Sequence, residues 1–158
     1  MKASIKNKLV SSLVKLDKKF PQIANGGCGI FASLLANELS KSGIDFSIHI
    51  AHNSLEEQMD AWIAKNDSEG SIDLSGINGF AWEHIYIKVD GKLIDSCGVY
   101  NYTCDNERFD DLYASAPISS NMLSQLITSS DVEWNMKFDR KKVKALSVEV
   151  TAMVSNNF

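Results

Sequence analysis

The sequence predicts an α+β fold in which a helix packs on a small antiparallel β-sheet. Apolar residues recur at helical spacing within residues 5–39, and an Asp-Gly turn signal joins two alternating segments within residues 81–98. The chain has 158 residues, which is enough to bury a full core, and it shows no internal repeat or low-complexity linker. We therefore expect a single domain over residues 1–158.

The N-terminal part is predicted to form two helices. A first amphipathic helix ends before Pro21, and its apolar stripe consists of Ile5, Leu9, Leu13, Leu16 and Phe20. Residues 22–27 form a loop. A second helix begins near Cys28 and ends near Ser42, where the following Gly43 suits a C-cap.

The middle of the chain alternates between strand and helix signals. Residues 45–50 alternate polar and apolar side chains, as a half-buried strand does. Ser54 and Glu57 match a capping box and predict a helix to about residue 64. Residues 66–79 are polar and contain glycine, which predicts a surface loop.

A β-hairpin is the strongest strand signal in the chain. We expect a strand over residues 81–89, a turn at Asp90-Gly91 and a return strand over residues 92–98. Farther on, residues 122–127 and 140–154 are predicted to be mainly helical, although a terminal strand stays open for the second segment. The hairpin supplies the sheet of the predicted α+β fold, and the later helices pack around it.

Composition and charge narrow the classes of function. Hydrophobic residues make up 44% and charged residues 23%, which is ordinary for a soluble globular protein, and the net charge is −4. An acidic balance argues against nucleic acid as a partner. Lysines gather near the N-terminus at positions 2, 6, 8, 15, 18 and 19. We interpret them as the solvated face of a helix in preference to a patch for a membrane or an acidic partner.

The sequence predicts a cytoplasmic protein with a free thiol and no membrane partner. The apolar run Leu9-Val10 is interrupted by Ser11 and Ser12, so no signal peptide forms, and no segment has the length of a membrane span. Three cysteines are an odd number and do not suggest a disulfide framework. A reducing compartment, where thiols persist, fits this pattern.

Cys28 is the leading candidate for a catalytic residue. It lies between glycines where the second helix is expected to begin, in the run Gly26-Gly27-Cys28-Gly29. A helix N-terminus carries a partial positive charge and free N–H groups, so a thiol placed there is pushed toward the nucleophilic thiolate. The neighbouring glycines leave room for a substrate to approach the backbone. This pattern predicts acyl-transfer chemistry.

A thiolate nucleophile needs a base, and the sequence contains only His49, His52 and His84. His84 is the best placed of the three, because it lies at the beginning of the predicted hairpin. A two-residue turn predicts three cross-strand pairs, which are Val89 with Lys92, Tyr86 with Asp95, and His84 with Cys97. Asp95 then becomes the diagonal neighbour of His84, roughly 7–8 Å away along the backbone and within reach of its ring.

The two faces of this hairpin differ in character. One face collects Ile85, Ile87, Val89 and Ile94, which predicts core, whereas the other carries His84, Tyr86 and Asp95. We assign Cys28 as the nucleophile, His84 as the general base and acid, and Asp95 as the group that holds the imidazole. Gln22, six residues before Cys28, would donate an oxyanion hydrogen bond, with the Cys28 N–H as a second donor.

These residues resemble the papain-like cysteine hydrolase superfamily in its compact form, which includes NlpC-type peptidases, transglutaminase-like proteins and arylamine acetyltransferases. The run from His84 to Asp95 looks like their His-strand, turn and strand-Asp element, and Gln22 has the spacing of the oxyanion glutamine. The likeness spans residues 20–100 and departs from papain at Gly29, where papain has an aromatic residue. It implies a papain-like fold and cofactor-free hydrolysis of a peptide, isopeptide or other amide bond in a protein or peptide.

Several alternatives stay open at this point. The same triad serves transglutaminase-type acyl transfer or deamidation, and the fold serves as a non-catalytic binding module if the triad is idle. Cys97 is a rival partner for His84, because the predicted register puts the two opposite each other. Cys28, Cys97, Cys104 and His84 form a zinc alternative, which the missing Cys-x-x-Cys pair and the spacing of Cys97 to Cys104 disfavour.

Overall fold

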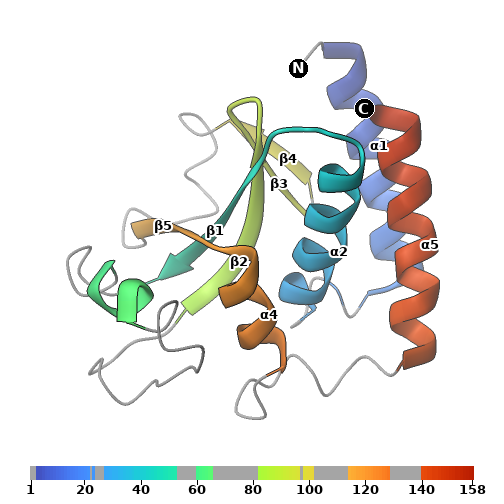
Figure 1. Ribbon diagram of the computed structural model, residues 1–158. Coiled ribbons are helices and arrows are strands. Elements are labelled where there is room, and N and C mark those ends of the chain that lie inside the picture. The colour runs from blue at the N-terminus through green and yellow to red at the C-terminus, as the bar shows by residue number, and fades with distance from the viewer. Residues whose placement is uncertain are drawn as a thin grey trace.

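The computed structural model describes residues 3–21, 23, 27–52, 60–65, 82–96, 98–101, 114–128 and 140–158. It confirms the α+β class, with helices beside an antiparallel sheet of five strands (Figure 1). The elements are α1 (Ala3–Lys19), α2 (Cys28–Lys41), β1 (Ser47–His52), β2 (Trp82–Val89), β3 (Lys92–Asp95), β4 (Gly98–Asn101), β5 (Ala114–Ile118), α4 (Ser120–Thr128) and α5 (Arg140–Asn157). Residues 60–65 are helical as well.

The sheet has the strand order β4-β3-β2-β1-β5, and every neighbouring pair is antiparallel. Asp90 and Gly91 join β2 to β3 with φ values of 50° and 71°. Two consecutive positive φ angles define the type I′ turn, which Asp-Gly favours and which matches the twist of the two strands. The expected pair of Val89 with Lys92 is present, so the register predicted from the turn is confirmed at its start.

The return strand is shorter than predicted. β3 ends at Asp95 instead of continuing to residue 98, and the chain reverses so that Asp95 pairs with Gly98 of β4. The Gly98 N–H donates to Asp95 Oδ1 at 2.9 Å and closes this reversal. The expected pairing of His84 with Cys97 cannot be followed here, because Cys97 lies outside the described residues.

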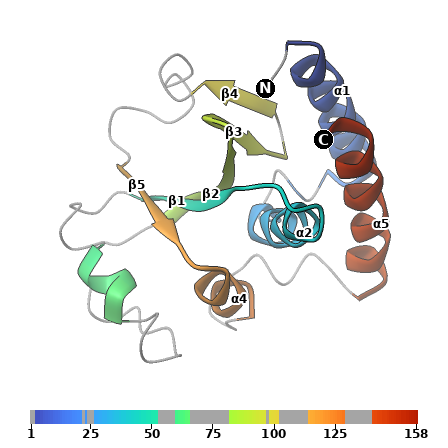
Figure 2. The ribbon, with the colours of Figure 1, turned by 45° about the horizontal axis from the view of Figure 1, so that its top comes forward.

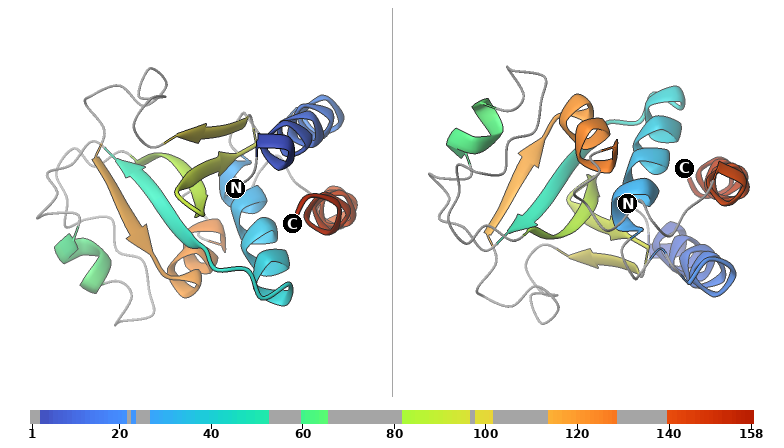
Figure 3. Two further views of the ribbon diagram at one scale, coloured as in Figure 1. Left: turned by 90° about the horizontal axis from the view of Figure 1, so that it is seen from above. Right: turned by 90° about the horizontal axis from the view of Figure 1, so that it is seen from below.

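α2 occupies the middle of the molecule. It lies between the sheet and the pair formed by α1 and α5, as the two views in Figure 3 show. Its buried residues are Cys28, Gly29, Ile30, Phe31, Ala32, Leu35, Ala36 and Leu39. The first five residues of α2 are all buried, whereas the rest of the helix buries one face, so the first residue of α2 is fixed by packing on several sides.

The C-terminus of α2 ends as the glycine predicts. Gly43 has a φ of 66°, and its N–H donates to Ser40 O at 3.1 Å, while the Ile44 N–H donates to Leu39 O at 3.0 Å. These two bonds form a Schellman motif, which leaves little freedom for the helix to continue. The boundary of α2 is thereby set at both ends, by Gly27 and by Gly43.

α1 and α5 form an antiparallel outer layer beside α2 (Figure 2). An ion pair joins Lys19 near the end of α1 to Glu149, and Asn157 Nδ2 donates to Ser12 Oγ at 3.3 Å. α5 is helical over its whole length, so the strand alternative for its second half is wrong. The apolar stripe predicted for α1 faces the core, where Leu9 and Leu13 are fully buried.

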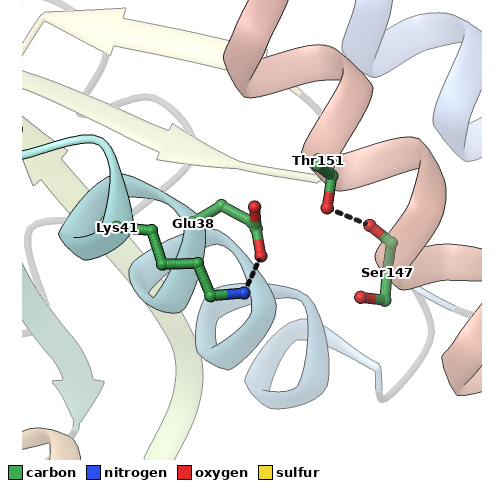
Figure 4. Close-up of polar contacts among 4 residues, drawn as sticks. All are labelled: Glu38, Lys41, Ser147 and Thr151. Carbon is green, nitrogen blue, oxygen red and sulfur yellow. Dashed lines mark hydrogen bonds and ion pairs between the residues drawn. The ribbon is translucent and has the colours of Figure 1, made fainter.

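A polar contact also joins α2 to α5. Lys41 Nζ donates to Glu38 Oε1 at 2.6 Å, and Thr151 on α5 lies on the other side of that carboxylate and donates to Ser147 O at 2.9 Å (Figure 4). The hydrogen bond from Lys41 holds the pKa of Glu38 below its usual value, and the nearby Thr151 has a smaller effect in the same direction. The last turn of α2 is therefore level with the part of α5 around Thr151.

The two faces of the sheet differ as predicted. Ile85, Ile87 and Ile94 are buried in the shared hydrophobic core with residues of α1, α2, α4 and α5. The opposite face carries His84, Tyr86 and Asp95. Gln22, the Ser54–Glu57 capping box and the predicted loop 66–79 lie outside the described residues. Within the described ranges, every helix is too short or too polar to cross a lipid bilayer.

Candidate active site

Cys28 opens the central helix. It is the first residue of α2, after Gly27 in a non-helical conformation with φ −102° and ψ 5°, and its exposed fraction is 6%. The first N–H groups of a helix have no intrahelical acceptor, and Gly27 offers no side chain to cap them. The thiol therefore lies just beneath the surface, at a helix end that favours negative charge.

His84 and Asp95 meet across the hairpin as the register predicted. His84 Nε2 donates to Asp95 Oδ2 at 2.9 Å, and the second oxygen of Asp95 accepts the Gly98 N–H. The Asp95 side chain is 1% exposed, against 18% for His84. Both oxygens of a buried carboxylate are engaged, so the carboxylate is held in one orientation and in turn fixes the imidazole.

Cys28 is the second partner of the imidazole. Since Nε2 faces Asp95, Nδ1 is the ring nitrogen that is left for the thiol, and Cys28 lies close enough to His84 to raise the pKa of its imidazole. Burial is the largest single influence on the pKa of His84 and lowers it. The hydrogen bonds and charges of Asp95 and Cys28 together outweigh burial and raise this pKa from 6.5 to about 9. His84 is consequently a cation at neutral pH.

A further row of aromatic rings continues from His84 across the same face. Tyr86 is buried, and its ring centroid lies 6.5 Å from that of His84. On its other side the Tyr86 ring stacks on His49 at 5.5 Å with an angle of 7° between the planes. His49 Nε2 is hydrogen-bonded to Ser47 Oγ at 2.9 Å. Burial, and to a smaller extent the charge of Lys88, lower the pKa of His49, so this imidazole is neutral.

The row of His84, Tyr86 and His49 was not predicted, although the sequence contains a signal for it. From the sequence, we select His84 among the three histidines and place Tyr86 only on the polar face of the hairpin. The strand alternation puts His49 and Tyr86 on one face, and the observed register pairs them directly. A register between residues 45–50 and 81–89 is not readable from the sequence, because no short turn joins these two segments.

Three of the predicted site residues come together, and the remaining ones are outside the described part of the chain. Cys28, His84 and Asp95 form one connected group. Gln22, Cys97 and Cys104 belong to segments that the structure does not describe. The zinc alternative depends on two of these residues. Among the residues that are described, no cluster of three or more His, Cys, Asp or Glu side chains is arranged to hold a metal ion.

Comparisons with known proteins add nothing to this geometry. No family model matches the chain, and neither a curated protein nor a solved structure matches it.

Proposed function

We propose that the chain is a cytoplasmic thiol hydrolase of the papain-like type, which cleaves an amide bond of a protein or peptide. The observation that carries the proposal is the double engagement of one imidazole. His84 is bound through Nε2 to the buried carboxylate of Asp95 and lies beside Cys28 at the start of a helix, close enough for Cys28 to raise the pKa of the imidazole. Nucleophile, base and orienting group stand in this relation in thiol hydrolases.

The reaction follows from the charges of these groups. The cationic His84 stabilises a thiolate at Cys28, which attacks the carbonyl carbon of the amide and forms a C–S bond. The carbonyl oxygen becomes an oxyanion, which the Cys28 N–H can stabilise. Collapse of this intermediate breaks the C–N bond, and the leaving amine takes the proton from His84. The product of this first half-reaction, the acylation of the enzyme, is a thioester at Cys28.

Water completes the cycle. The now neutral His84 removes a proton from a water molecule, whose oxygen attacks the thioester and displaces the thiolate. A carboxylic acid leaves, and the cationic imidazole is restored. Asp95 keeps its charge throughout and stabilises the imidazolium in both halves. The α+β architecture supports the assignment, because a helix that opens on the nucleophile packs here on an antiparallel sheet that carries the histidine and the aspartate.

Alkylation of Cys28 tests the proposal. A buried thiol without activation is inert, whereas a thiolate held by an imidazolium stays nucleophilic below neutral pH. We expect iodoacetamide to label Cys28 at pH 6 roughly ten- to a hundredfold faster than a free model thiol, because the positive charge of the neighbouring imidazole favours attack by the sulfur. Peptide mass spectrometry measures the rate at Cys28 separately from the rates at Cys97 and Cys104.

Two variants make this test specific. Cys28→Ala removes the fast label and should abolish cleavage of a peptide library, read as new carboxyl termini. Asp95→Asn keeps the shape of the side chain but removes its charge, and it should slow the alkylation of Cys28. Labelling of Cys28 no faster than the model thiol would support a non-catalytic binding module instead.

A further inference from the structure

Charge is distributed very unevenly between the outer helices and the rest of the molecule. α1 and α5 contain nine of the sixteen basic residues but only Asp17 and Glu149 among the twenty acidic ones. Their net charge is therefore +7, whereas the rest of the chain carries seven basic and eighteen acidic residues and a net charge of −11. The overall charge of −4 conceals a strongly basic layer.

The basic side chains of this layer point to solvent. All those on α1 and α5 whose side chains are described are exposed, including Lys8 and Lys15 on α1 and the run from Arg140 to Lys142 on α5. The described residues have three exposed large apolar side chains, and all belong to this layer or directly follow it. They are Val14, Val148 and Phe158, with exposed fractions of 42%, 62% and 42%. The surface of the α1–α5 layer is thus cationic and includes a few exposed apolar side chains.

The N-terminus of α5 carries positive charge where a helix favours negative charge. Its first turn contains Arg140, Lys141 and Lys142 and no acidic residue. The helix dipole is positive at this end, so the cations are placed unfavourably for the stability of the isolated helix. An anionic partner at this position would be stabilised by the cations and by the positive end of the helix dipole together.

This basic end of the layer lies at the same end of the molecule as Cys28. α2 and α5 run in the same direction (Figure 1), and Glu38 of α2 lies beside Thr151 of α5 (Figure 4). Cys28 precedes Glu38 by as many residues as Lys141 precedes Thr151. Because both helices rise by the same length per residue, the first turn of α5 is level with the first turn of α2.

The layer also contains a groove. A cavity of about 530 Å³ lies between α1 and α5, lined by Lys8, Lys15, Asn157 and their neighbours. It is at the opposite end of the layer from Arg140, because Asn157 is at the end of α5. A segment bound along the layer would run from this groove toward the end where α2 begins.

We propose that the α1–α5 layer binds an acidic polypeptide segment of the substrate and presents the neighbouring amide bond to Cys28. This inference rests on the proposed function, since it names the substrate class of that site. Charge complementarity favours an acidic ligand. The exposed apolar side chains of Val14 and Val148 favour a polypeptide over a nucleic acid. The acidic remainder of the chain would also repel the long charged backbone of a nucleic acid. A membrane is disfavoured because both helices direct their large apolar faces into the core.

Binding is tested without catalysis in the full chain with Cys28→Ala. Fluorescence anisotropy with labelled poly-L-glutamate should show binding that is lost in about 0.5 M NaCl, where charges are screened within a few ångströms. Lys141→Glu with Lys144→Glu should weaken binding about tenfold or more, whereas Lys141→Arg with Lys144→Arg should retain it. Lys65→Glu with Lys92→Glu, which changes the charge equally but outside the layer, should have little effect.

The unfolding temperature separates a lost binding surface from a damaged fold. Glu at position 141 suits the helix N-terminus, so the doubly reversed variant should unfold at the same temperature as the parent protein or higher. Tighter binding to phosphatidylserine vesicles or to single-stranded DNA than to poly-L-glutamate would overturn the proposal. Light scattering provides a further test. A salt-sensitive dimer that dissociates in the variant Lys141→Glu with Lys144→Glu would also overturn the proposal, in favour of a second copy of the chain as the partner.

Wild-type protein distinguishes this inference from the proposed function. The charge-reversed variant, Lys141→Glu with Lys144→Glu, should leave the alkylation rate of Cys28 unchanged. It should lower kcat/KM only for substrates with an acidic segment. A reactive Cys28 without binding of poly-L-glutamate would overturn the docking surface alone. An inert Cys28 in a protein that binds poly-L-glutamate would overturn the hydrolase and the role of this surface in catalysis.

Discussion

His84 and His49 lie on the same face of neighbouring strands, on either side of Tyr86, yet their pKa values move in opposite directions. Burial lowers the pKa of both, and Lys88 lowers that of His49 further. For His84, a carboxylate and a thiol oppose the effect of burial and raise its pKa to about 9. Burial alone would leave two neutral rings, so the position of Asp95 decides which histidine becomes a cation.

The largest expected effect comes from removing that carboxylate. In Asp95→Asn, the hydrogen-bonding group stays but its charge is lost, so burial is opposed only by Cys28. We expect the pKa of His84 to fall from about 9 toward its ordinary value of 6.5, and His84 then resembles His49. Imidazole resonances followed by NMR between pH 5 and pH 10, assigned with His84→Gln and His49→Gln, measure both values.

Cys28→Ala is the matched control for this measurement. Asp95 gives the largest single influence that raises the pKa of His84, and Cys28 gives the next two, so loss of the thiol should also lower this pKa. The pKa of His49 should not change in either variant. A His84 that keeps its pKa in Asp95→Asn would show that the carboxylate does not cause the difference between the two histidines.

The same contrast predicts a smaller effect on stability, with opposite signs for the two rings. His84 has a raised pKa, so its contribution is complete below pH 6.5 and is lost as the pH rises toward about 9. His49 has a lowered pKa, so its contribution is complete above pH 6.5 and is lost as the pH falls through its folded value. Urea unfolding across this range gives the free energy at each pH.

Single variants separate the two declines in stability, the one at alkaline pH from His84 and the one at acidic pH from His49. Asp95→Asn should flatten the decline between pH 6.5 and pH 9, and His49→Gln should flatten part of the decline below pH 6.5. Other groups titrate equally in the parent and the variant, so the difference between their profiles isolates each histidine. An alkaline decline that is identical in wild type and Asp95→Asn would mean that His84 is not a cation in the folded state.

The part of the site that could be predicted depends on local chain geometry. Asp90-Gly91 selects a type I′ turn, a two-residue turn sets the register, and the register brings His84 and Asp95 together. The helix start at Cys28 was readable from its glycines and from the apolar residues that follow. Each of these inferences spans only a few residues, so no tertiary information was needed.

The failures arise where distant segments determine the structure. The return strand ends at Asp95 because its carboxylate binds the Gly98 N–H, a choice that the alternation of residues 92–98 does not reveal. β5 was missed because Ala114–Ile118 has little β-branched character and contains Pro117. Proline is tolerated there because β5 is an edge strand beside β1, and strand order is a property of the whole sheet.

The smallest expected effect comes from Lys88, which lies on the same strand as His84 but affects His49. Its charge is the second cause of the lowered pKa of His49, after burial. In Lys88→Gln we expect this pKa to rise slightly and to stay below 6.5, because burial persists. The pKa of His84 should not move, since Lys88 is not among the groups that shift it. An equal shift of both resonances by NMR would mean that the rings titrate together through Tyr86, and the two histidines would then have to be treated as one coupled system.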